Sequence, residues 1–310
     1  MILDGFATQS IAAGAHCLRA GGLLGLPTET VYGLAADAEN EQAVRRVFAV
    51  KGRPADHPLI IHLAAAEQVL DGWAEPFPAS AAALAASCWP GPITLLVVAG
   101  PRVGPWITGG RTTVGLRVPA HPLATRMLEA FGGAVAAPSA NRFGRVSPTT
   151  AAHVLADLGD DVDLILDGGE CPVGVESTIV DCTVEPAQLL RPGAITLEQV
   201  KIILGDVAGA SGPSRAAGML ASHYAPRCTV SLFESQQEAH SHLERLRSSG
   251  ERAVWFDATG DLAKAARTLY TALRKADLDG ALEFVAVLPP PEGLGYAIRD
   301  RLTKAAAPRP

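Results

Sequence analysis

Two short polar segments, each directly after an apolar run, constrain the fold of this chain more than any other feature. Residues 27–34 (Pro-Thr-Glu-Thr-Val-Tyr-Gly-Leu) follow the apolar residues 22–26, and residues 138–141 (Pro-Ser-Ala-Asn) follow 134–137. An apolar strand that ends in hydroxyl and glycine residues is typical of open α/β sheets, which bind ligands at the carboxyl ends of their strands. The sequence therefore predicts an α/β fold with a ligand site where these segments meet.

The composition is that of an ordinary globular chain. Its 310 residues are 48% hydrophobic and 19% charged, and they are enough for two domains. The longest apolar run, residues 93–99, is far shorter than the roughly 20 residues of a membrane-spanning helix. The N-terminus lacks the pattern of a signal peptide, and the cysteines are odd in number without paired spacing. We expect a cytoplasmic protein with reduced thiols, no membrane segment and no zinc site.

Charge and missing motifs narrow the function classes. A net charge of −6 argues against strong direct binding to a nucleic-acid backbone. A small anionic ligand needs only a local cluster of cations, such as Lys51, Arg53 and Arg117. The sequence has no phosphate loop of the G-x-x-x-x-G-K-[ST] type, no G-x-G-x-x-G, no H-E-x-x-H and no G-x-S-x-G. A nucleotide would have to bind by a less common device.

The chain divides into two parts by its pattern of elements. Residues 1–206 mix strand and helix signals without strict alternation, which predicts a mixed sheet. Asn40 is expected to cap one helix there, and Ser147 and Pro148 are expected to open another. Residues 229–310 alternate strand and helix regularly, which predicts a smaller three-layer α/β domain on a mostly parallel sheet. Residues 207–228 lose periodicity and are predicted to be a linker.

The cations around residue 51 have two interpretations. Lys51-Gly52-Arg53-Pro54 is a standard helix stop, with a cation in the last turn, glycine after it and proline beyond. However, Lys51 and Lys201 are the only lysines before the linker. In a segment rich in arginine, a lysine indicates that a compact point charge is needed, as beside phosphate.

The other polar candidates also leave two interpretations open. His62, in an apolar strand, has the placement of a core histidine. Arg117 lies in the apolar strand 114–118 and must expose its guanidinium or pair with an anion, because an unpaired buried charge costs several kcal/mol. Residues 176–178 fit the wet face of a strand, and residues 139–147 fit a hydrogen-bonded loop. No single motif decides between structure and function.

Read together, the motifs resemble those of the YrdC-type threonylcarbamoyl-AMP synthase family, in its long two-domain form. The resemblance covers nearly the whole chain. It implies a YrdC-like twisted mixed sheet with flanking helices in 1–206, a linker that serves as a lid in 207–228, and a smaller Rossmann-like α/β domain in 229–310. The matching segments are 27–34, 51–54, His62, 115–119, 138–141, 147–149, 176–181, 191–194 and 223–226.

The resemblance implies an enzyme, an L-threonylcarbamoyladenylate synthase. It would join L-threonine, bicarbonate or CO₂, and ATP into L-threonylcarbamoyladenylate and pyrophosphate. The product would pass to a tRNA threonylcarbamoyl transferase complex, which modifies adenosine next to the anticodon. The expected cofactor is Mg²⁺, held mainly by the ATP phosphates and not by protein ligands.

The resemblance also carries residue roles over by position. The expected threonine ligands are Thr30, His62, Arg117, the backbone at Ala137, and Ser177. The expected ATP ligands are Arg53, His57, Thr113, Ser139, Ser147, Arg191 and Tyr224, and the expected catalytic group is Lys51, Arg53, Ser139 and Asn141. Two positions depart from the family: His57 stands where asparagine is common, and Leu220 where a basic residue is common.

Two other functions fit part of this pattern. An RNA-binding module without turnover would share the fold and would feed the same tRNA chemistry, although the acidic charge balance opposes it. A carbamoyltransferase that forms a related carbamoyl-adenylate, as in hydrogenase maturation, would share the first domain. The two-domain layout and the absence of zinc-finger cysteines oppose that alternative.

Overall fold

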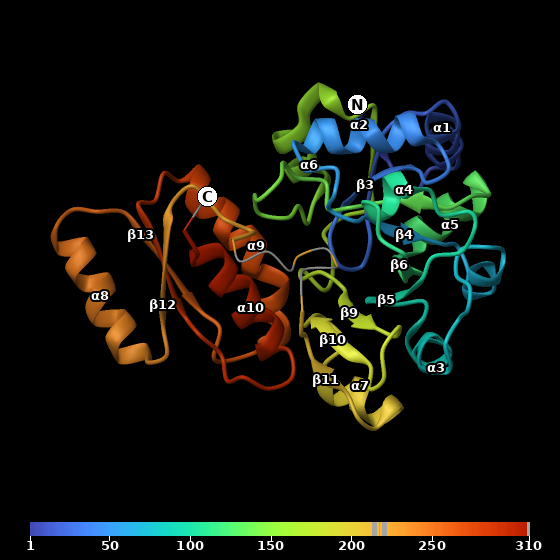
Figure 1. Cartoon of the computed structure of the whole chain (residues 1–310). Helices are drawn as coiled ribbons and strands as arrows, with labels where there is room; N and C mark the ends of the chain where they lie inside the picture. The colour runs from blue at the N-terminus through green and yellow to red at the C-terminus, as the bar shows by residue number, and fades with distance from the viewer. Residues whose placement is uncertain (213–215, 217, 219–221, 309–310) are drawn as a thin grey trace.

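The computed structural model describes residues 1–212, 216, 218 and 222–308. They form a large mixed sheet with flanking helices, the large domain, and a separate smaller α/β unit, the small domain (Figure 1). This confirms the predicted fold class. No helix among these residues is both long and apolar enough to cross a membrane.

Within the described residues, the sheet of the large domain has 11 strands in the order β1-β8-β2-β3-β7-β4-β6-β5-β9-β10-β11. Pairing is mixed, as predicted: β4 and β6 are parallel, while β3 and β7 are antiparallel. The strands are β1 (Ile2–Asp4), β2 (Leu24–Leu26), β3 (Gly33–Asp37), β4 (Ile60–His62), β5 (Ile93–Val98), β6 (Thr113–Arg117), β7 (Val135–Ala136), β8 (Leu164–Asp167), β9 (Thr178–Asp181), β10 (Gln188–Arg191) and β11 (Ala208–Gly209). The sheet thus extends two residues into the segment predicted to be linker.

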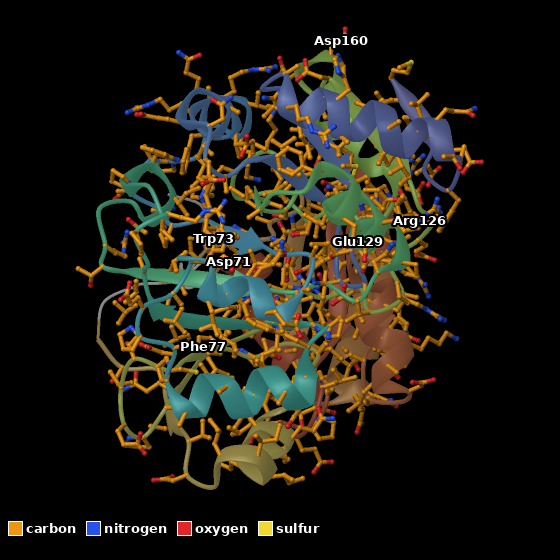
Figure 2. All side chains as sticks on the ribbon, turned by 90° about the vertical axis from the view of Figure 1, so that its right-hand side faces the viewer. Asp71, Trp73, Phe77, Arg126, Glu129 and Asp160 are labelled. Carbon is orange, nitrogen blue, oxygen red and sulfur yellow. The ribbon has the colours of Figure 1, made fainter. Side chains whose placement is uncertain are left out.

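Helices cover both faces of this sheet. Helix α5 shows why: Leu123, Met127 and Phe131 are buried on one side, while Arg126 and Glu129 lie on the solvent side (Figure 2). Each large apolar side chain buried in this way contributes about 1.5–3 kcal/mol. The helices of this domain are α1 (Thr8–Arg19), α2 (Glu41–Lys51), α3 (Ala79–Cys88), α4 (Pro105–Thr108), α5 (Pro122–Phe131), α6 (Ala151–Leu158) and α7 (Leu197–Leu204).

The ends of α2 and α6 test the capping predictions. Helix α2 begins after Asn40, whose side chain accepts the amide of Ala43, and it ends at Gly52 with φ 62°, as the sequence predicts. The predicted start of α6 at Ser147 is wrong. Thr150 caps that helix, because the Ser147 hydroxyl is engaged elsewhere. The sequence pattern also missed β1, α1, β3, α4 and the short strand β11.

The small domain has three parallel strands in the order β12-β14-β13, with helices on both faces. Its elements are β12 (Thr229–Phe233), α8 (Gln236–Ser248), β13 (Ala253–Asp257), α9 (Leu262–Leu278), β14 (Glu283–Val287) and α10 (Gly295–Ala306). Figure 1 shows α8 on the outer face, and α9 and α10 between the small sheet and the large domain. The regular alternation predicted from the sequence is confirmed.

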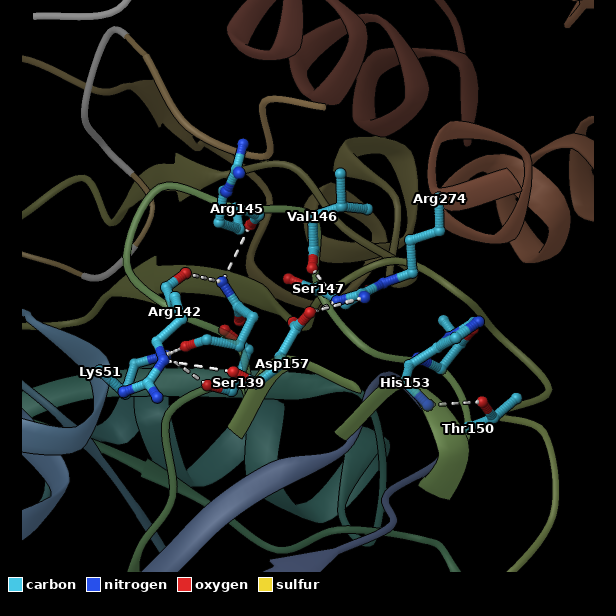
Figure 3. Close-up of polar contacts among 12 residues, drawn as sticks. Lys51, Ser139, Arg142, Arg145, Val146, Ser147, Thr150, His153, Asp157 and Arg274 are labelled. Atoms are coloured by element: carbon cyan, nitrogen blue, oxygen red, sulfur yellow. Dashed lines mark hydrogen bonds and ion pairs between the residues drawn. The ribbon is translucent and has the colours of Figure 1, made fainter. Parts of the chain in front are cut away.

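Helix α9 packs directly on the loop before β9. A Cβ added to Gly174, which has φ 79°, would lie 2.4 Å from the Cα of Arg267, so only glycine allows this approach. Further along α9, Arg274 forms an ion pair of 2.6 Å with Asp157 of α6 (Figure 3). The small domain is therefore held against the residues just before β9.

Candidate active site

One cavity gathers most of the residues that the sequence singled out. It has a volume of about 60 Å³ and is lined by segments after β2 and β7, by β4 and the residues before it, by the end of β6, and by residues around β9 and β10. The parallel register of β4 and β6 places His62 opposite Arg117. All five expected threonine ligands line it: Thr30, His62, Arg117, Ala137 and Ser177.

Arg117 is both paired and part of the cavity. Its Nη2 lies 2.6 Å from Oε1 of Glu29, and its Nη1 donates to the Thr30 hydroxyl at 3.0 Å. Its Nε donates to the carbonyl of Gly91 at 3.3 Å. A guanidinium has five N–H groups, so this arrangement leaves donors for a ligand carboxylate. The ion pair with Glu29 explains how an arginine that exposes only 4% of its surface can stay charged.

His62 is neutral in this environment. Burial, with the charge of Arg117 as a second cause, lowers its pKa to about 3. Its Nδ1 has no hydrogen-bond partner among the described residues. Leaving such a buried polar atom unpaired costs about 1–3 kcal/mol, so His62 is better explained as a ligand-binding residue than as a packed core histidine.

Four of the expected ATP ligands also line the cavity: Arg53, Ser139, Arg191 and Tyr224. Burial lowers the pKa of Arg53 to about 10, which still leaves it charged at neutral pH. Its Nη2 donates to the Pro58 carbonyl at 3.0 Å, and no carboxylate of the described chain forms an ion pair with it. This cation is therefore available to an anion.

The other three expected ATP ligands are not among the lining residues. Thr113 is the half-buried first residue of β6, and His57 packs its ring 5.4 Å from that of Phe143. Ser147 is fully buried and donates to Oε1 of Glu176 at 2.6 Å. Direct contact between these residues and ATP requires a wider cavity than this one.

Lys51 does not line the cavity, although the sequence grouped it with Arg53 and Arg117 as a cation for an anionic ligand. Its Nζ donates to the carbonyls of Ser139 at 2.5 Å and Asn141 at 2.6 Å (Figure 3). Asn141 in turn donates to the carbonyls of Arg142 and Arg145. Lys51 and Asn141 thus both hold the loop that carries Ser139, and their expected catalytic role stays a prediction.

The reason is local geometry. Lys51 occupies the last turn of α2, which packs beside residues 139–141, and its ammonium satisfies two carbonyls that would otherwise be buried without a donor. Burial, with Arg53 as the next cause, holds the pKa of Lys51 well below its usual range. Arg191 takes the place of Lys51 as the third cation at the cavity.

The contact of Lys51 with these two carbonyls can be tested against direct contact of Lys51 with phosphate. Replacing Lys51 with methionine keeps the volume but leaves two carbonyls without a donor, which should lower the free energy of unfolding by about 1–3 kcal/mol. Turnover should fall about fivefold, because Ser139 is displaced. Denaturant unfolding and steady-state kinetics measure the two effects. A variant that loses turnover with unchanged stability would instead favour direct contact between Lys51 and phosphate.

Four residues at or near the cavity were not recognised from the sequence as part of the site. Glu29 pairs with Arg117, and Glu176 is buried at the cavity wall, although its segment was interpreted as the wet face of a strand. Tyr270 and Arg301 reach Glu176 from the small domain. No local signal marks the last two, because they lie about a hundred residues away in the chain.

His223 and Tyr224 fill much of the cavity. They expose 7% and 1% of their surfaces, and Tyr224 has φ 61°, which costs a residue other than glycine about 1–3 kcal/mol. Pockets for small molecules usually measure about 300–1,000 Å³, so this cavity of about 60 Å³, with His223 and Tyr224 among its lining residues, is small for one. Within the predicted linker, residues 213–215, 217 and 219–221, including Leu220, lie outside the described residues.

These features define a class: a two-domain α/β protein with three arginines at one cavity, built to bind small anionic ligands. A family model described as "Telomere recombination" (Sua5_yciO_yrdC) matches residues 16–193, and one described as "Threonylcarbamoyl-AMP synthase, C-terminal domain" matches 195–307. The chain belongs to this Sua5/YciO/YrdC family of threonylcarbamoyl-AMP synthases.

Individual relatives also support this family membership. The threonylcarbamoyl-AMP synthases of Pyrococcus abyssi and Bacillus subtilis are 40% and 38% identical, over 96% of this chain in each case and 94% and 93% of theirs. A putative threonylcarbamoyl-AMP synthase of Mycobacterium tuberculosis is 35% identical over 64% of this chain and 90% of its own length. The structure of P. abyssi Sua5 complexed with L-threonine matches with a TM-score of 0.94 at 37% identity, over 99% of this chain and 97% of that one.

Proposed function

We propose that this chain synthesises L-threonylcarbamoyladenylate and pyrophosphate from L-threonine, bicarbonate or CO₂, and ATP, for threonylcarbamoyladenosine formation in tRNA. One observation carries the proposal: Arg53, Arg117 and Arg191 meet at a single cavity with neutral His62, whose Nδ1 has no hydrogen-bond partner among the described residues. The full-length relatives named as this synthase, and the related structure with L-threonine, support it.

The threonine half of the site follows from charge and hydrogen bonding. Arg117 offers its remaining N–H groups to the threonine carboxylate, which favours a planar, bidentate donor. Neutral His62 contributes its Nδ1 to a polar atom of threonine. The threonine amine can then attack the carbon of CO₂ and lose a proton to form a carbamate. With bicarbonate as the source, water leaves as well.

The ATP half follows from the two other arginines. An oxygen of the carbamate attacks the α-phosphorus of ATP, the bond from that phosphorus to the bridging oxygen breaks, and pyrophosphate leaves. Negative charge builds up on phosphate oxygens, and Arg53 and Arg191 stabilise it electrostatically. Since both reactants are anions, holding them together is itself much of the catalysis.

Mg²⁺ is proposed to enter with ATP. No group of three or more histidine, cysteine or acidic residues in the described part of the chain could hold a metal. Glu176 lines the cavity and is already paired with Arg301, and nearby Glu29 is paired with Arg117. The phosphates are thus the natural ligands, and the ion's chemistry when bound is to neutralise their charge.

The linker is proposed to act as a lid. ATP and threonine cannot share about 60 Å³ with His223 and Tyr224 in place, so these side chains withdraw for binding and close again over the bound substrates. Closure excludes water from a hydrolysable product. We further propose that the adenylate passes to a tRNA threonylcarbamoyl transferase complex. A cytoplasmic location is supported by five free cysteines.

The test is to incubate the protein with ATP, Mg²⁺, bicarbonate and each amino acid in turn. We expect pyrophosphate and an adenylate of the mass of threonylcarbamoyl-AMP with threonine alone. Carbamoyl phosphate in place of bicarbonate tests the carbamoyltransferase alternative. Affinity for tRNA that survives physiological salt, without ATP turnover, would replace the proposal by an RNA-binding function.

A further inference from the structure

Glu176 is an acidic side chain in a cavity that must accept anions. It exposes 6% of its surface and lines the cavity together with Arg53, Ser139 and Arg191. Two reactants of the proposed function, ATP and the carbamate, carry negative charge. A lone carboxylate there would repel both, because charges interact strongly where water is excluded.

The small domain supplies the compensating contacts. Arg301 of α10 lies fully buried, and its Nε donates to Oε2 of Glu176 at 2.8 Å. The hydroxyl of Tyr270 on α9 donates to the same oxygen at 2.6 Å. From the large domain, Ser147 donates to Oε1 at 2.6 Å. Glu176 is thereby fixed by both domains.

Arg301 also contacts the ring of Tyr224 and the backbone next to Arg191. Its Cζ lies 5.3 Å from the centre of the Tyr224 ring, which stacks on Tyr270 at 5.6 Å. Its Nη1 donates at 2.9 Å to the carbonyl of Pro192, next to Arg191. Its Nη2 has no hydrogen-bond partner among the described residues. Arg301 thus touches three parts of the cavity wall at once.

We propose that Arg301 is a positioning residue for the ATP site: by pairing with Glu176 it removes the negative charge that would repel the triphosphate. This inference rests on the proposed function. The small domain then contributes one charge to the large domain's cavity, and that contribution is a reason for the domain to be docked there.

The titration of Glu176 gives an independent readout. Burial raises its pKa, but Arg301 and Arg191 outweigh burial, and the pKa falls to about 2. Without Arg301 it should rise. The other groups facing Glu176 do not titrate between pH 6 and 8: the pKa of His223 is about 3, and those of Tyr224 and Tyr270 are raised further above 10 by burial. Arg191 also faces Glu176, and burial lowers its pKa.

The experiment measures the Kd for Mg·ATP by titration calorimetry on the full chain, with adenylate formation followed separately. Arg301→Gln should raise the Kd about tenfold at pH 8. The double variant Arg301→Gln/Glu176→Gln should recover at least half of that loss on a logarithmic scale. Arg299→Gln, on the same helix but paired with exposed Glu234, is the matched control and should leave the Kd unchanged.

Two further results belong to this prediction. The ratio of the Kd of Arg301→Gln to that of the wild type should fall between pH 8 and pH 6, as Glu176 takes up a proton. Arg301→Lys keeps the charge and should stay within about threefold of the wild type. If thermal unfolding shows that Arg301→Gln does not fold, the Kd of Arg301→Lys is compared with that of the double variant instead.

Two results would show that Arg301 does not act by neutralising Glu176. A purely structural role for Arg301 predicts that the double variant binds ATP no better than Arg301→Gln, and that the Kd ratio is independent of pH; either result overturns the inference. Failure of the proposed function looks different. In that case the wild-type chain forms no adenylate from threonine, whatever the effect of Arg301 on ATP binding.

Discussion

Replacing Arg53 with alanine should lower the turnover of adenylate synthesis by about 10- to 100-fold, since it removes a charge-assisted contact of ~1.5–3 kcal/mol in the transition state. Arg53 lines the cavity, remains charged, and within the described part of the chain is hydrogen-bonded only to the backbone carbonyls of His57 and Pro58. The KM for ATP should rise by a smaller factor than kcat falls, because the negative charge on the phosphate oxygens increases as the reaction proceeds. Pyrophosphate release measured over a range of ATP concentrations separates the two.

The structure also predicts that Arg53→Ala folds normally. No buried carboxylate loses its partner, unlike the case of Arg117, whose removal would leave Glu29 unpaired at a cost of about 3–5 kcal/mol. Arg45→Ala is the matched control, because Arg45 lies on α2, the helix just before Arg53, in an exposed pair with Glu41. Unchanged pyrophosphate release by Arg53→Ala would remove this residue from the proposed mechanism.

Ending the chain at Gly205 should reduce adenylate synthesis by about two orders of magnitude, since misplaced site residues alone can cost that much. The truncation removes Tyr224, Tyr270 and Arg301, so the cavity loses its lid and Glu176 loses its ion pair. The large domain should remain folded. The M. tuberculosis relative, which matches little beyond this domain, supports that expectation.

Circular dichroism and thermal unfolding check that the truncated chain is folded, and mass spectrometry of the adenylate measures its activity. Adding Tyr224 back by ending the chain at residue 228 is the companion experiment. It should restore little activity, since Tyr270 and Arg301 hold Tyr224 in place. Full activity of the chain that ends at Gly205 would eliminate both the lid and the contribution of the small domain.

Local patterns were sufficient wherever the cause was local. The stop at Gly52, the cap at Asn40 and the alternation of the small domain follow from neighbours in sequence, and all three are confirmed. The start of α6 could not be predicted in this way. Ser147 and Thr150 are both good caps, and a carboxylate 29 residues away, Glu176, engages the first of them.

The sequence by itself determined the fold class, the family and the short motifs from which the cavity is built, because those depend on strand ends, turns and residue types that are adjacent in the chain. Only the tertiary structure decided which charges meet. Lys51 turned out to support the Ser139 loop, and Arg301 to reach Glu176 from the other domain. The physical reason is that a buried charge takes whatever partner the packing brings within about 3 Å, and sequence spacing does not encode that distance.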